Sequence, residues 1–180
     1  MNIWGRLLKL AGWSVDITTP YREKVVICVA PHTPNWDFIM GLLAYRSLGR
    51  KANFLMKKFW FFFPLKYLMK ALGGIPVNTE KSQSLTSLII EDFRKRDYLN
   101  LAVTPEGSRS PVEKWKTGFL TIAFNAKVPV QLGVIDFKNK KVIIQEEFYP
   151  TGNNESDLKE IRKYYSGFKH AALYPEKFIP

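Results

Sequence analysis

Residues 25–37 read VVICVAPHTPNWD, so an apolar run leads directly into a polar loop that ends in an acid. The first six residues are rich in β-branched side chains and long enough to form a buried strand. A helical pattern then runs from Phe38 to Gly49, with Thr33 as candidate N-cap and Pro34 as candidate first helical residue. A strand that leads straight into a helix predicts one unit of an α/β fold.

This joint carries two groups that suit general base catalysis, His32 at the strand end and Asp37 about one turn further on. A neutral imidazole can take a proton from a hydroxyl, while a carboxylate on its other nitrogen fixes the tautomer and stabilises the imidazolium. The alternative is that Asp37 only favours a helix N-terminus electrostatically and His32 is a turn residue. The second histidine, His170, lies in a polar tail.

A second polar loop, TPEGSRSP at residues 104–111, follows another apolar run at residues 99–103. Its proline, glycine and serines predict a tight loop at a strand end. Arg109 suits bidentate binding of phosphate or carboxylate, and Glu106 can orient a hydroxyl or pair with a cation. The alternative is a polar turn with an internal pair between Glu106 and Arg109.

Four blocks of the sequence resemble those of the glycerolipid acyltransferase family, which includes the lysophosphatidic-acid acyltransferases, and they occur in the family's order. They are His32 with Asp37 (His, four residues, Asp), residues 74–78 (Gly-Ile-Pro-Val-Asn), residues 105–110 (Pro-Glu-Gly-Ser-Arg-Ser) and residues 128–130 (Val-Pro-Val). Two positions depart from the family pattern. Ser108 replaces a threonine, and Thr79 stands where the family usually has an arginine.

Strands alternate with helices along the chain, which predicts an α/β sheet sandwich. The resemblance implies the same: one acyltransferase-like domain over residues 1–180, with a mixed central sheet flanked by helices and the motif loops at one edge. It also implies an O-acyltransferase similar to 1-acylglycerol-3-phosphate acyltransferases. Such an enzyme moves a fatty acyl group from a thioester carrier to the hydroxyl of a lysophospholipid or related glycerolipid, with His32 as the base and Asp37 orienting it.

The resemblance further implies the residues that bind substrate. They are Lys57, Gly74, Lys81, Glu106, Gly107, Ser108 and Arg109. Glu106 would position the acceptor, Arg109 would hold its phosphate, and Gly107 with its neighbours would offer backbone N–H groups to anions. Because Thr79 lacks a guanidinium, either Lys57 or Lys81 replaces it or the acceptor carries a different head group. Acyl-coenzyme A or acyl carrier protein is the expected co-substrate, and neither a cofactor nor a metal is expected.

The basic residues are unevenly distributed in this chain of 180 residues with a net charge of +11. Between Phe38 and Thr79 there is no acidic residue, whereas seven lysines and arginines alternate with a dense group of aromatic residues. Aromatic rings and long basic chains suit the headgroup region of a membrane, so we predict a membrane interface here. The alternative is that residues 60–63 are core. No nucleic-acid recognition signature is present, so no nucleic-acid partner is expected.

Residues 3–13 predict a short amphipathic helix, within a possible N-terminal unit of residues 1–15, that lies on a membrane or packs on the body. The single cysteine, Cys28, excludes an internal disulfide framework and a cysteine-rich zinc site. No apolar run approaches the ~20 residues that span a bilayer, and a signal-peptide pattern is lacking. We expect a cytoplasmic protein on the inner face of the membrane. The rival interpretations are a non-catalytic membrane-surface lipid-binding protein of the same fold and, more remotely, a nucleic-acid binder.

The remaining pattern is simple. It predicts helices at residues 65–72, 82–96, 119–125 and 157–168, strands at residues 75–78, 99–103, 128–135 and 141–148, and a polar, turn-like segment at residues 16–23.

Overall fold

The computed structural model describes residues 2–34, 36–77 and 85–180, and its centre is a seven-stranded sheet in the order β1-β7-β6-β2-β5-β3-β4. The strands are β1 (Ser14–Ile17), β2 (Lys24–Val29), β3 (Asn53–Lys57), β4 (Gly74–Val77), β5 (Leu99–Val103), β6 (Val130–Asp136) and β7 (Lys141–Phe148). The run from β6 to β4 is parallel, β7 is antiparallel to β6, and β1 is parallel to β7. The predicted mixed α/β sheet is confirmed.

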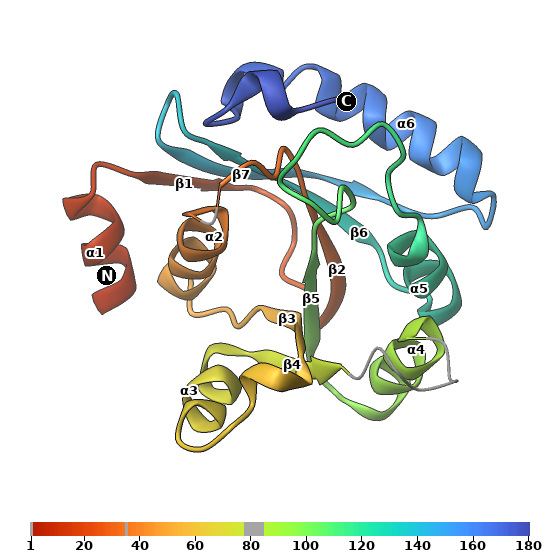
Figure 1. The fold of residues 1–180 in the computed structure, drawn as a ribbon, viewed down its shortest axis with the longest axis horizontal. Coiled ribbons are helices and arrows are strands. Elements are labelled where there is room, and N and C mark those ends of the chain that lie inside the picture. The colour runs from red at the N-terminus through yellow and green to blue at the C-terminus, as the bar shows by residue number, and fades with distance from the viewer. Residues whose placement is uncertain (1, 35, 78–84) are drawn as a thin grey trace.

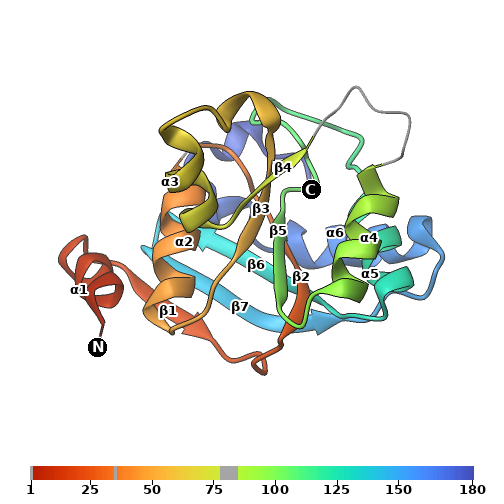
Figure 2. The same cartoon turned by 90° about the horizontal axis from the view of Figure 1, so that it is seen from below.

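Helices cover both faces of this sheet (Figures 1 and 2). They are α1 (Ile3–Leu10), α2 (Trp36–Ser47), α3 (Leu65–Leu72), α4 (Leu85–Lys95), α5 (Gly118–Ala126) and α6 (Asn154–Ser166), with short 3₁₀ turns η1 (Lys58–Trp60), η2 (Lys169–Ala171) and η3 (Pro175–Lys177). Figure 1 shows the sheet curving around α2, while α4, α5 and α6 lie on its other side. None of the helices in the described ranges has the length and hydropathy needed to cross a bilayer.

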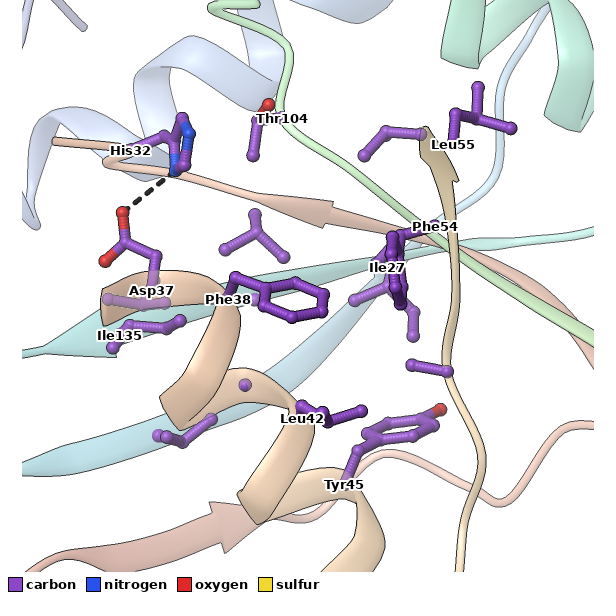
Figure 3. A pocket seen from close by; sticks show the side chains of 18 of the residues that line it. Ile27, His32, Asp37, Phe38, Leu42, Tyr45, Phe54, Leu55, Thr104 and Ile135 are labelled. Carbon is purple, nitrogen blue, oxygen red and sulfur yellow. Dashed lines mark hydrogen bonds and ion pairs between the residues drawn. The ribbon is translucent and has the colours of Figure 1, made fainter. Parts of the chain in front are cut away.

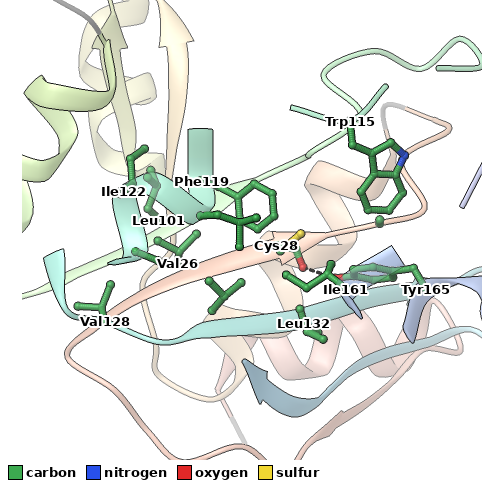
Figure 4. Close-up of a cluster of buried hydrophobic side chains, with 14 of the residues drawn as sticks. Val26, Cys28, Leu101, Trp115, Phe119, Ile122, Val128, Leu132, Ile161 and Tyr165 are labelled. Atoms are coloured by element: carbon green, nitrogen blue, oxygen red, sulfur yellow. Dashed lines mark hydrogen bonds between the residues drawn. The ribbon is translucent and has the colours of Figure 1, made fainter. Parts of the chain in front are cut away.

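The central strand β2 is buried on both faces, which explains its unbroken apolar sequence. Val25 and Ile27 face the α2 side, whereas Val26 and Cys28 join the larger core beneath α5 and α6. Figure 4 shows this core, where the buried hydroxyl of Tyr165 donates to the carbonyl oxygen of Cys28 at 2.6 Å. The strand that leads to His32 is therefore held rigidly from both sides.

The N-terminal helix α1 packs on the body of the protein. Its Leu8 is buried against α2 and the sheet, and the guanidinium of Arg46 lies 4.9 Å from the centre of the Trp4 ring. The side chains of Ile3, Leu7 and Leu10 remain exposed on the outer side of the helix.

Three expectations about local structure were wrong. The segment that starts at Ser14 forms the edge strand β1, which a four-residue stretch with two polar side chains did not reveal. Pro34 is not helical: α2 starts at Trp36, and the N–H of Thr33 donates back to the Asp37 carboxylate. The tail around His170 is not merely polar, because neighbouring residues such as Phe178 are buried in the main core.

Candidate active site

The two polar loops meet because they follow neighbouring parallel strands. Strand β2 pairs with β5 in a register that sets Cys28 opposite Val103, so both strands end at the same edge of the sheet. The loop after β2 carries His32 and the loop after β5 carries Glu106, 74 residues further along the chain. The predicted convergence of these motif loops at one edge is confirmed.

His32 and Asp37 form a direct pair. The ring nitrogen Nδ1 of His32 lies 2.9 Å from Oδ2 of Asp37, and the same oxygen accepts the backbone N–H of Thr33 at 3.1 Å. Since an ionised carboxylate can only accept, Nδ1 carries the hydrogen and Nε2 is left with a lone pair. The Asp37 side chain is buried while the His32 side chain is about one-fifth exposed. This geometry leaves Nε2 as the ring nitrogen that can accept a proton.

Glu106 bridges the two loops. Both of its carboxylate oxygens accept the backbone N–H of His32, each at 3.1 Å, and the residue is buried. The contact ties the loop after β5 to the main chain of His32. In this structure the Glu106 carboxylate thus binds a backbone N–H of the protein, which the sequence pattern did not indicate.

Burial dominates the electrostatics of both acids. Loss of hydration raises the pKa of Glu106 to about 8, against the opposing effect of the His32 N–H, and the neighbouring charge of Asp37 adds to the rise. Burial also raises the pKa of Asp37, whereas the hydrogen bonds from His32 and from the Thr33 N–H lower it. Near pH 7 the arrangement therefore favours a neutral Glu106 beside the His32–Asp37 pair.

A deep apolar pocket of about 580 Å³ begins at this pair. It lies between α2 and the curved sheet, with Phe38 and Leu42 on one wall and Ile27 and Phe54 on the other (Figure 3). Its volume falls in the range of roughly 300–1,000 Å³ typical of small-molecule sites. A pocket of this kind suits a hydrocarbon chain whose reactive end lies at His32.

Tyr45 lies at the far end of the pocket from the histidine (Figure 3). It stands eight residues beyond Asp37 on the same helix, which corresponds to about 12 Å. Its hydroxyl donates to Oδ1 of Asn100 at 2.7 Å, and Asn100 in turn donates to the carbonyl oxygens of Arg22 and Glu23 at 3.0 Å. This buried network fixes the Tyr45 ring at that end of the pocket.

Of the loop residues predicted to bind substrate, some line the pocket and others do not. Gly107 lines the pocket, but its N–H donates to the carbonyl of Thr104 at 3.1 Å, so that donor is engaged within the turn. Ser108 accepts the N–H of Ser110 through its hydroxyl, and Arg109 is exposed on the loop. Neither Ser108 nor Arg109 lines the pocket.

The remaining predicted residues lie further away. Gly74 is buried in β4, where a Cβ would approach the carbonyl oxygen of Met69 to 2.9 Å, so its place there is explained by packing. Lys57 is exposed at the end of β3 and does not line the pocket. Thr79 and Lys81 lie outside the described residues.

Lys116 is a residue of the site that sequence reasoning missed. It lines the pocket together with His32 and Gly107, on the same loop as Glu106 but ten positions later. The only signal was a cation between Trp115 and Thr117 just before a helix, which is common on protein surfaces. Elsewhere in the described ranges, no group of three His, Cys, Asp or Glu side chains could hold a metal ion.

Comparison with protein families agrees with this geometry. The model of the family described as Acyltransferase matches residues 15–134, which include all four sequence blocks, His32 and Glu106. This chain belongs to the acyltransferase family. No curated protein matches it significantly.

Membership supports a transferase that uses an acyl donor and a lipid acceptor. The matched region contains the His32–Asp37 pair, the loop with Glu106 and most of the pocket wall, from Ile27 through Val134. The part of the chain that the family defines is therefore the part that builds the candidate site.

Proposed function

We propose that this protein is an O-acyltransferase that moves a fatty acyl group from a thioester carrier to the hydroxyl of a lysophospholipid or related glycerolipid. One observation carries the proposal: the His32–Asp37 pair lies at the mouth of a long apolar pocket. A base that can activate a hydroxyl, next to a space that can hold a hydrocarbon chain, is what acyl transfer to an alcohol requires.

The proposed reaction proceeds without a covalent enzyme intermediate. Nε2 of His32 takes the proton of the acceptor hydroxyl, and the oxygen attacks the thioester carbonyl to give a tetrahedral oxyanion. Collapse of this oxyanion breaks the carbon–sulfur bond, and the imidazolium returns its proton to the thiolate of the carrier. Asp37 stabilises the imidazolium between these steps. Cys28 is not a candidate nucleophile, because it is fully buried on the other face of β2 and burial raises its pKa.

The proposal is tested by acyl transfer from labelled acyl-coenzyme A and acyl carrier protein to a panel of lysolipids on anionic vesicles. His32→Ala and Asp37→Asn should each reduce kcat by about 10²–10⁴-fold, the usual contribution of a general base. His170→Ala is the matched control, since it removes the other histidine from an exposed position. Transfer that survives His32→Ala would overturn the mechanism. Lipid binding with no transfer to any acceptor would favour the non-catalytic alternative.

We also propose that the protein works at the cytoplasmic face of a membrane, through a surface next to the site. This basic–aromatic surface is formed by the last residue of β3, η1, α3 and the residues between η1 and α3. It comprises Phe59, Phe62, Phe63, Tyr67 and Leu68 with Lys57, Lys58, Lys66 and Lys70. Phe59 and Phe63 are 79% and 75% exposed, so these two rings are not core.

The position of this surface supports docking to lipid. Strand β3 runs parallel to β5, so η1 starts at the same edge of the sheet as the His32 loop. Arg46 of α2 donates to the carbonyl oxygen of Ala71 at 2.6 Å, which ties α3 to the helix that forms the pocket wall. A bilayer into which the aromatic rings insert would therefore lie next to the opening of the pocket, where a lipid substrate could enter.

Vesicle co-sedimentation tests the docking surface independently of activity. Each basic side chain near anionic lipid contributes roughly 1 kcal/mol, so Lys58→Gln with Lys70→Gln should weaken binding to anionic vesicles by roughly 30-fold. Lys159→Gln with Lys163→Gln makes the same change in net charge on exposed positions of α6 and should have little effect. Equal effects of the two pairs would show that net charge, not this surface, governs binding.

A further inference from the structure

The side chain of Lys116 lies across Gly107 in the motif loop. A Cβ built on Gly107 would come within 2.7 Å of Cε and 2.8 Å of Nζ of Lys116, so the lysine occupies space that any other residue at 107 would fill. The backbone of Gly107 has a φ of 64°, in the region that favours glycine. The missing side chain at this position thus allows the ammonium group to reach the pocket mouth.

The main chain that carries Lys116 is held firmly. Its N–H donates to the carbonyl oxygen of Pro105 at 2.8 Å, which fixes it to the start of the motif. The neighbouring Trp115 is buried, and its indole N–H donates to the carbonyl oxygen of Ile179 at 3.1 Å. The backbone of Lys116 is therefore fixed, and only the torsions of its side chain remain free.

The positive charge of Lys116 is not neutralised within the described part of the chain. No carboxylate there forms an ion pair with it. The two acids of the site are otherwise engaged, since Asp37 bonds the His32 ring and Glu106 bonds the His32 N–H. An exposed ammonium group thus lines an otherwise apolar pocket together with the proposed base, and it is free to pair with an anionic group of a substrate.

We propose that Lys116 binds a phosphate group of a substrate at the pocket mouth, beside the hydroxyl that His32 deprotonates. The inference rests on the proposed function and adds which chemical group of a substrate lies at the polar end of the pocket. A lysine ammonium brings a full charge and three donors, which suits phosphate oxygens. The phosphate belongs either to the head group of the acceptor or to a coenzyme A donor, and the experiment separates these two sources.

The test compares two acceptors and two donors in the same neutral vesicles. The acceptors are lysophosphatidate and monoacylglycerol, which differ by the phosphate, and the donors are acyl-coenzyme A and an acyl-pantetheine thioester without phosphate. Lys116→Gln should lower kcat/KM for lysophosphatidate about 10- to 100-fold, the usual cost of losing a hydrogen bond to a charged group. Transfer from the acyl-pantetheine to monoacylglycerol, in which neither substrate carries a phosphate, should not change. Lys114→Gln, at an exposed position two residues away, is the matched control.

The outcomes separate cleanly. A loss that follows the acceptor phosphate supports the acceptor as its source, whereas a loss seen only with acyl-coenzyme A assigns the phosphate to the donor. No loss, or the same loss in all four combinations, would overturn the inference. Equilibrium binding of the two acceptors to His32→Ala protein, with and without Lys116→Gln, tests it even without turnover. If the wild type transfers to neither acceptor, binding of lysophosphatidate and of coenzyme A to protein with and without Lys116→Gln still decides the role of Lys116, while the panel of lysolipids decides the proposed function.

Discussion

Replacing Glu106 by glutamine should change how the stability of this protein depends on pH. The carboxyl has an ordinary pKa of 4.5 in the unfolded chain and about 8 in the folded protein, chiefly because it is buried. Between these values the folded protein binds a proton that the unfolded chain has released. The contribution of Glu106 to the free energy of unfolding therefore falls as pH rises from about 4.5 to about 8, and levels off above that.

The size of the effect follows from the two pKa values. Each pH unit between them is worth about 1.4 kcal/mol, so the whole interval amounts to several kcal/mol. Glutamine has the same shape, keeps an oxygen that accepts the His32 N–H and cannot ionise. Glu106→Gln should thus match the wild type near pH 4.5 and exceed its stability by several kcal/mol at pH 9. Asp37, whose pKa is also raised, is present in both proteins, so its contribution largely cancels in the difference.

Equilibrium unfolding in urea, followed by tryptophan fluorescence from pH 4.5 to 9, measures this difference directly. Glu113→Gln is the control, because it removes an exposed carboxylate from the same loop. Its curve should run parallel to that of the wild type at every pH. Parallel curves for Glu106→Gln as well would refute the reasoning, since they would show that the buried carboxyl does not hold a proton in this range.

Three further predictions concern the loop, the pocket and the core. Gly107→Ala should cost about 1–2 kcal/mol in urea unfolding because φ is positive there, and it should push the Lys116 chain aside. Tyr45→Leu should leave Oδ1 of Asn100 without its hydrogen bond, which should lower the free energy of unfolding by about 1–3 kcal/mol. It should also shift the preferred acyl chain to greater length, and an unchanged chain-length profile would contradict the role of this ring. Cys28 should not react with a thiol reagent at pH 8 until urea is added, since burial raises its pKa.

Much of the fold could be predicted from the sequence, because its strongest signals are local. The apolar run of β2 records its burial directly, because four consecutive residues of that strand are buried. The edge strand β1 gave no such signal, because it pairs on one side only and its residues are exposed or half-buried. What defines it as a strand is its distant partner β7, which no local pattern can show.

The site likewise combines contacts that are local in sequence with contacts between distant segments. The pair of His32 and Asp37 is only five residues apart in sequence, so local structure at the start of α2 brings the two together. The bond between Glu106 and the His32 N–H depends instead on the neighbouring positions of β2 and β5 in the sheet, and the place of Lys116 over Gly107 depends on how the loop after β5 folds back on itself. Residue types and spacing indicated the chemistry of this loop, but only the tertiary structure assigns each side chain its contact.

The order of the strands also has a consequence during synthesis of the protein. Strand β2 lies between β5 and β6, both made much later, and Glu106 follows His32 by 74 residues. At ribosomal rates of about 5–20 residues per second, the nascent chain waits roughly 4–15 s before the loop with Glu106 has been made. During that time one of its most apolar strands has neither neighbour and is open to chaperones or to other chains. The His32–Asp37 pair is encoded early, yet it gains a rigid support only when a far younger part of the chain folds beside it.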